Sequence, residues 1–128
     1  MTIELPEGMT IPSVNKHKEV GRGGKHMFKN PRVRKYQEEI KEQLKGSCLE
    51  NVSSPDSPVL RVGFKFYFKN RYWRRDVTNM IKATEDGLKD VLGIDDGRTV
   101  YITAEKIRTS EKIEKVEIKV EVFDEDSV

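Results

Sequence analysis

The stretch LRVGFKFYFKNRYWRRDVTNMIKATEDGLKDVL, residues 60–92, switches from one hydrophobic period to another. Apolar and basic residues alternate from Leu60 to Lys69, which predicts a strand with one buried face and one basic face. Apolar residues then recur at helical spacing from Val77 to Leu92, which predicts an amphipathic helix. Gly93 suits the end of that helix. Residues 60–92 therefore predict a strand followed by a helix.

A second helix is predicted upstream of this strand. Asn30 is a suitable N-cap, and Pro31 is a suitable first-turn residue because its fixed φ angle matches the helix. An apolar stripe follows at helical spacing, formed by Val33, Tyr36, Ile40 and Leu44. Gly46 suits the end of the helix, and the Ser- and Pro-rich residues 46–58 predict a linker.

Three shorter segments complete the predicted fold. Thr2–Leu5 predicts a short strand, and residues 99–107 and 116–122 alternate as two further strands. We expect these last two strands to form a hairpin around Thr109–Ser110, followed by a frayed acidic tail at residues 123–128. This order of elements predicts an α+β fold with a small mixed sheet and two helices.

Length and composition narrow the class of protein. A chain of 128 residues predicts one domain, spanning residues 1–128, with a core small enough that dimerisation would help to stabilise it. The lone Cys48 excludes an internal disulfide and a Cys-rich metal site. The sequence shows no secretory signal peptide and no apolar run of the ~20 residues that a membrane span needs. We therefore expect a cytoplasmic protein with no membrane partner.

The charges are unevenly distributed along the chain. Residues 16–35 contain eight Lys or Arg and one acid, within a predicted basic loop at residues 8–30 and the start of the next helix. Residues 61–75 contain six basic residues and no acid, whereas residues 111–126 contain seven acids and three lysines. Each run alone suits a solvated face, but two basic blocks together favour a polyanion partner.

The residues from Asp76 to Asp96 suggest a chemical site. An acid stands near each end of the predicted helix, with Asn79 and Lys82 between them and two arginines, Arg74 and Arg75, just before. This combination suits a hydrated divalent cation beside a phosphodiester, because Mg²⁺ needs only one or two carboxylates plus water and phosphate oxygens. Taken singly, the same residues have simpler interpretations: an N-cap for Asp76, a turn for Asp95-Asp96-Gly97 and a surface lysine for Lys82.

The sequence resembles the RusA family of Holliday-junction resolvases. The resemblance rests on Arg74-Arg75-Asp76-x-x-Asn79-x-x-Lys82, on Asp86, and on Gly93-Ile94-Asp95-Asp96 before a strand. Ile11-Pro12-Ser13-Val14-Asn15 is similar to a second family motif, so the resemblance covers nearly the whole chain. It implies a small homodimeric enzyme, often carried by bacteriophages or prophages, that nicks four-way DNA junctions symmetrically in recombination and repair with Mg²⁺ or Mn²⁺ and no small-molecule cofactor.

The resemblance also implies roles for individual residues. Asp76 and Asp96 match catalytic aspartates, Lys82 matches a functional lysine, and Asp95 matches an acidic neighbour, so the implied metal ligands are Asp76, Asp95 and Asp96. Thr78 departs from the best-known member, which carries a third aspartate there. Asn79, Asp86 and Thr78 would support the site. The residues expected to bind DNA phosphates are Arg74, Arg75, Lys16, Arg22, Lys25, Lys29 and Arg32.

Other functions remain open at this point. A non-catalytic or weakly active branched-DNA-binding protein of the same fold would explain Thr78, since one carboxylate fewer weakens metal binding. A small protein-interaction domain would leave the basic blocks unexplained.

The helix also sets a geometric condition. About 14 residues of helix advance ~20 Å, so Asp76 and Asp96 start at opposite ends. Either the loop after Gly93 folds back along the helix, or Asp96 approaches Asp76 of a partner subunit.

Overall fold

Strand β2 (Pro58–Phe68) is one of the two inner strands of a four-stranded sheet. The chain is described by a computed structural model that covers residues 1–13, 31–47, 58–69, 75–93, 96–124 and 126. The other elements are β1 (Thr2–Glu4), α1 (Pro31–Leu44), α2 (Val77–Leu92), the 3₁₀ turn η2 (Asp96–Arg98), β3 (Thr99–Arg108) and β4 (Lys115–Asp124). The predicted α+β class, with two helices and a small mixed sheet, is confirmed.

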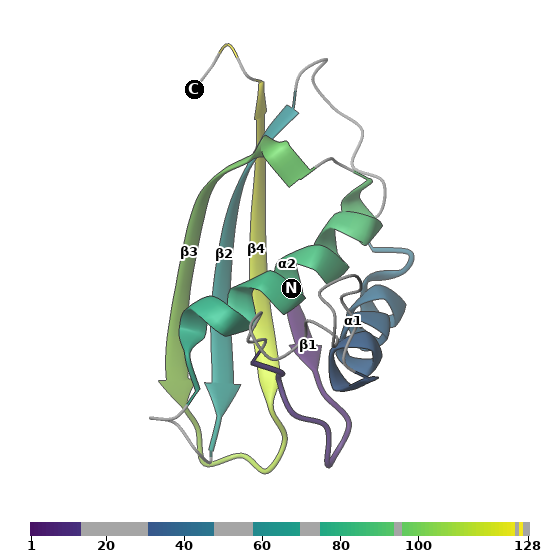
Figure 1. Ribbon diagram of the computed structural model, residues 1–128, viewed down its shortest axis with the longest axis vertical. Helices are drawn as coiled ribbons and strands as arrows, with labels where there is room; N and C mark the ends of the chain where they lie inside the picture. The colour runs from purple at the N-terminus through teal and green to yellow at the C-terminus, as the bar shows by residue number, and fades with distance from the viewer. Residues whose placement is uncertain (14–30, 48–57, 70–74, 94–95, 125, 127–128) are drawn as a thin grey trace, which may run out of the picture.

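The strand order is β1-β4-β2-β3, so β3 and β4 lie on opposite sides of β2 (Figure 1). The predicted hairpin between them is therefore wrong. β3 pairs with β2 in parallel, as a strand that returns through a helical crossover must, and β4 pairs with β2 antiparallel. This register sets Ile118 beside Phe64 and Val116 beside Phe66, so the apolar face of β4 extends the apolar face of β2.

Strand ends also differ from the sequence-based boundaries. The acidic tail was expected to begin at residue 123, but β4 continues through Phe123 and Asp124, which pair with Val59 and Pro58. Ladder hydrogen bonds and a cation–π contact outweigh the charge here, because the Arg61 guanidinium lies 4.7 Å from the Phe123 ring centroid. Pro58, the last residue of the expected linker, already belongs to β2.

Part of the expected basic loop is also described. Residues 8–13 have no regular secondary structure, and residues 14–30 lie outside the described part of the chain.

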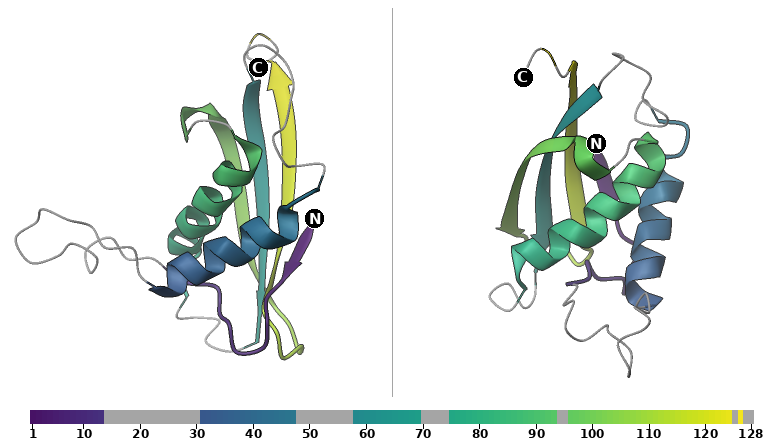
Figure 2. Two further views of the ribbon diagram at one scale, coloured as in Figure 1. Left: turned by 90° about the vertical axis from the view of Figure 1, so that its right-hand side faces the viewer. Right: turned by 45° about the horizontal axis from the view of Figure 1, so that its top comes forward.

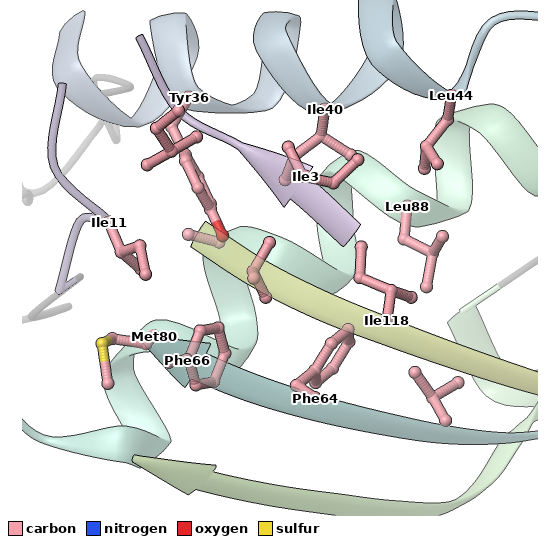
Figure 3. Packing of buried hydrophobic residues seen from close by; sticks show 14 of the residues in the cluster. Ile3, Ile11, Tyr36, Ile40, Leu44, Phe64, Phe66, Met80, Leu88 and Ile118 are labelled. Atoms are coloured by element: carbon pink, nitrogen blue, oxygen red, sulfur yellow. The ribbon is translucent and has the colours of Figure 1, made fainter. Parts of the chain in front are cut away.

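Both helices cover one face of the sheet, and the core lies between them and the strands (Figures 1 and 2). Leu60, Val62, Phe64, Phe66 and Phe68 are all buried, which confirms the predicted apolar face of β2, while Arg61, Lys65 and Lys69 are exposed. Figure 3 shows Phe64 and Phe66 facing side chains of both helices, including Tyr36 and Leu88. No helix in the described ranges has the length and apolar character that crossing a membrane requires.

The two helices pack closely where α2 carries a glycine. A Cβ at Gly87 would lie 3.4 Å from the Gln37 Cα, at the short end of ordinary van der Waals contact, so little more than a methyl group would fit between the helices here. Gln37 donates to the Ala83 carbonyl at 3.0 Å, and the buried Tyr36 and Thr84 hydroxyls lie 2.6 Å apart. These buried polar groups fix how α2 lies against α1, and thereby the direction in which α2 crosses the sheet.

Phe66→Ala should destabilise the protein by about 3–5 kcal/mol, because the side chain is fully buried and its removal leaves a cavity. Lys65→Ala, on the exposed face of the same strand, should change stability by less than ~0.5 kcal/mol. Denaturant unfolding measures both free energies. Equal losses for the two variants would contradict the assignment of the buried face.

Candidate active site

Asp76 caps the N-terminus of α2 from an extended backbone conformation, with φ −80° and ψ 119°. Its Oδ1 accepts the Thr78 backbone N–H at 3.0 Å and the Thr78 hydroxyl at 2.5 Å. Both donors end on the same oxygen, and Oδ2 has no hydrogen-bond partner among the described residues. The N-cap reading of Asp76 is therefore correct, and it leaves one exposed carboxylate oxygen for another ligand.

The environment keeps this carboxylate ionised. The Thr78 hydroxyl, then the Thr78 backbone N–H, and then the positive charge of Lys106 lower the pKa of Asp76 below its usual range. The helix N-terminus adds a positive field of its own. An anionic carboxylate on an exposed residue is the state that a hard divalent cation requires.

Arg75, the residue before Asp76, is held by three contacts. Its Nη1 lies 2.6 Å from Oε1 of Glu114, and the two side chains are only 12% and 11% exposed. Its guanidinium lies 4.6 Å from the Phe68 ring centroid. The Arg75 carbonyl accepts a 2.9 Å hydrogen bond from Lys106. The arginine that the motif suggested as a DNA contact is thus also part of a buried ion pair.

Lys106 and Glu114 were not identified from the sequence as site residues. Lys106 lies in β3, paired with Phe66, on the face of the sheet that the helices cover. A lysine at a core-facing position of an alternating strand is a signal that could have found it. Glu114 gives no such signal, because its partners Arg75 and Ile11 are 39 and 103 residues away in the sequence.

Lys82, Asn79 and Asp86 occur at steps of three and four residues along α2, and the structure connects two of them directly. Lys82 Nζ lies 3.1 Å from Asp86 Oδ1, and the side chains are 47% and 39% exposed. An ion pair this exposed contributes little to stability. It leaves Lys82 accessible to an incoming phosphate, which would compete with Asp86 for the ammonium group.

The second acidic position lies at the far end of the helix. Asp96 begins η2, directly before β3, whose Thr99 pairs with Leu60 at the start of β2. Arg75 instead contacts Phe68, at the end of β2. About eight strand residues, or roughly 26 Å, separate these ends. The chain continues from η2 into β3 without folding back along α2 (Figure 1), so the two acids of one chain stay apart.

A groove of about 630 Å³ lies beside the Arg75–Glu114 pair. Its wall is the turn at Pro6–Thr10, and the remaining lining comes from Arg32 and Lys35 of α1 with Arg75 and Glu114. Arg32, expected to bind DNA, therefore lies near Arg75. Lys35 is a further basic residue in the lining of this groove.

Several expected site residues lie outside the described residues: Arg74, Asp95, Lys16, Arg22, Lys25 and Lys29. Within the described ranges, no three His, Cys, Asp or Glu side chains gather as a metal cluster would require. What the described residues offer a metal is the ionised Asp76, whose hard oxygen donor suits Mg²⁺ or Mn²⁺.

Comparison with known proteins identifies the family of the chain. A family model described as Endodeoxyribonuclease RusA matches residues 8–121 of the 128. The match includes both helices, β2, β3 and most of β4, together with Asp76, Lys82 and Asp96. A search of curated proteins finds no match to the chain. The chain belongs to the RusA endodeoxyribonuclease family, a family of nucleases that resolve Holliday junctions.

Proposed function

We propose that this protein is a Mg²⁺- or Mn²⁺-dependent, structure-selective DNA endonuclease that resolves Holliday junctions by paired, symmetric phosphodiester hydrolysis. The observation that carries the proposal is Asp76, an exposed carboxylate with a lowered pKa and one oxygen without a partner in the described structure. Family membership supplies the reaction class, nuclease action on branched DNA.

The acidic residues would hold the metal. Asp76 provides an ionised oxygen, and Asp96, aided by Asp95, provides the second acidic position of the motif. A bound divalent cation would polarise the scissile phosphate and lower the pKa of the attacking water. Thr78 donates two hydrogen bonds to Asp76, which lower the pKa of that carboxyl, but it supplies no carboxylate in place of the third aspartate of the family motif.

The basic residues would bind and stabilise phosphate. Lys82 is exposed on α2 and would stabilise the charge that develops on the phosphate. Asp86 would hold the lysine in place before the substrate binds. Asn79 would orient a ligand or a water molecule. Arg32, Arg74, Arg75 and the basic residues of the 8–30 loop would bind backbone phosphates without reading sequence.

A homodimer would bring the two acidic positions together. Because Asp76 and Asp96 of one chain lie at opposite ends of α2, each complete site would take Asp76 from one subunit and Asp96 from the other. Such a two-fold dimer also suits a symmetric junction that needs two cuts. β3, at the edge of the sheet, exposes apolar side chains on both faces near Asp96: Val100, Tyr101 and Ile102 are 50%, 57% and 38% exposed.

The runner-up function is a non-catalytic or weakly active protein that binds branched DNA. Thr78 favours this reading, because it replaces a carboxylate of the family motif with a neutral hydroxyl. A Mg²⁺ titration on a synthetic four-way junction separates the two functions: symmetric nicks identify the enzyme, and a shifted complex without nicks identifies the binding protein.

Asp76→Asn and Asp96→Asn should each lower the rate of junction nicking by more than ~100-fold. Loss of a residue that only hydrogen-bonds to a metal ligand typically costs ~10–100-fold, and loss of a ligand itself should cost more. Junction binding should persist, because removing a negative charge does not weaken attraction to phosphate. Asp90→Asn is the matched control, since Asp90 is an exposed acid on the same helix, paired with Lys41. Gel-based nicking and binding assays measure both activities, and full nicking by either site variant would refute the assignment.

Mixed dimers test the shared site directly. A dimer of one Asp76→Asn subunit and one Asp96→Asn subunit contains one site with both acids intact if the sites are shared, and none if each site lies within a chain. We therefore expect two inactive variants, co-expressed with different tags and purified as a heterodimer, to nick one strand of a junction. A heterodimer that forms and remains inactive would contradict the shared site.

Thr78→Asp should lower the half-saturating Mg²⁺ concentration for nicking, because it adds a carboxylate next to Asp76. Without metal, the two like charges should repel, so the melting temperature should rise more on Mg²⁺ addition than it does for wild type. Thr78→Asn gives a side chain with the shape of aspartate but without its charge, so this variant should show neither effect. A melting temperature of Thr78→Asp that is insensitive to Mg²⁺ would argue against a metal at this position.

A further inference from the structure

Glu114 is a buried acid with no role in the chemistry proposed above, and it is 9% exposed. One oxygen, Oε1, receives two donors: the Arg75 guanidinium at 2.6 Å and the Ile11 backbone N–H at 2.8 Å. The Glu114 carbonyl accepts the Leu5 N–H at 2.9 Å. A single residue just before β4 therefore connects the N-terminal segment to the residue that precedes Asp76.

The contacts to Arg75 leave that residue little freedom. Glu114 holds the guanidinium, the Phe68 ring lies against it, and Lys106 binds its carbonyl oxygen at 2.9 Å. These partners come from three different segments of the sheet region. Because Asp76 follows Arg75 directly in the chain, fixing both the side chain and the carbonyl of Arg75 fixes where the Asp76 carboxylate can lie.

Stability alone is a weak reason for such an arrangement. Burying an ion pair costs desolvation of both charges, and well-packed apolar residues often stabilise a fold equally well. A buried ion pair that fixes one backbone position is more useful beside a catalytic group, because such a group needs a defined position.

We propose that Glu114 is a positioning residue for Asp76, acting through Arg75. The same residue holds residues 5–11 beside this point, Ile11 through its carboxylate and Leu5 through its backbone carbonyl, so that this segment is aligned with the metal-binding end of α2. The proposal rests on the proposed function in one respect, the role of Asp76 as a metal ligand.

The test compares Glu114→Gln with Glu85→Gln in the full-length protein. Glu85 forms a similarly buried ion pair with Lys89, at 3.0 Å and with 12% and 9% exposure, but on the middle of α2 and without contact to Arg75. The half-saturating Mg²⁺ concentration for junction nicking and the KM for the junction are measured for both variants. Hydrogen exchange of the Ile11, Thr78 and Met80 amides is measured in parallel by NMR.

For Glu114→Gln we expect the half-saturating Mg²⁺ concentration to rise by about 10-fold, with the rate largely restored at saturating Mg²⁺. The Ile11 and Thr78 amides should exchange about 10-fold faster, because their bonds depend on the held segment. Glu85→Gln should leave the half-saturating Mg²⁺ concentration and the amide exchange rates unchanged. Unchanged Mg²⁺ dependence and unchanged exchange in Glu114→Gln would overturn the proposal, as would a higher junction KM without a change in Mg²⁺ dependence.

A second variant covers the case in which Glu114→Gln does not fold. Arg75→Lys keeps the charge balance with Glu114 but cannot place a guanidinium group over the Phe68 ring, and it should produce the same shift in Mg²⁺ dependence. A shift in junction KM alone would again overturn the proposal. If the wild-type protein nicks no four-way junction at any Mg²⁺ concentration, the proposed function fails, while the hydrogen-exchange comparison still decides whether Glu114 positions Asp76.

Discussion

The parallel pairing of β2 with β3 is the constraint on which the rest of the structure depends. Two parallel neighbours must be joined by a crossover that returns along the whole length of the sheet, and α2 is that crossover. The motif acids are therefore carried to opposite ends of the sheet by the connection itself. The same crossover leaves the other edge of β2 open, and β4 occupies it.

The start of α2 combines structural and chemical roles in a few residues. An N-cap carboxylate normally satisfies the first free N–H groups of its helix, and Asp76 does so with one oxygen. Thr78 binds this same oxygen with its hydroxyl, so the capping interaction and the low pKa have one origin. The helix cap thus prepares the charge that a metal would require, while the second oxygen has no hydrogen-bond partner among the described residues.

Sequence periodicity predicted the elements whose contacts are local. The strand from Leu60 and the helices from Pro31 and Val77 appear as expected, because alternation and helical spacing are set by each segment's own burial. The cap at Asp76 was also visible, since its bonds reach only two residues along the chain. The sequence did not predict which strand pairs with residues 116–122. A strand can pair with either edge of β2, and the packing of the whole core determines which edge it takes.

The same reasoning explains which site contacts were missed. Glu114 reads as one acid in an acidic run, and only the fold brings it to Arg75 and Ile11. Phe123 and Asp124 read as a tail, since their pairing partners at Val59 and Pro58 lie far upstream. Hydropathy and charge describe a residue's own preference, whereas these contacts arise from packing between distant segments.

The length of α2 has a consequence for a dimer with shared sites. In such a dimer, the N-terminal end of α2 would contribute to one cutting site and the residues after its C-terminal end to the other. The 16 residues of the helix, about 24 Å long, would then set the distance between the two scissile phosphates. Adding or removing one turn would change this spacing by ~5.4 Å without altering the residues at either end. In this protein, substrate geometry would be encoded in the length of a secondary-structure element.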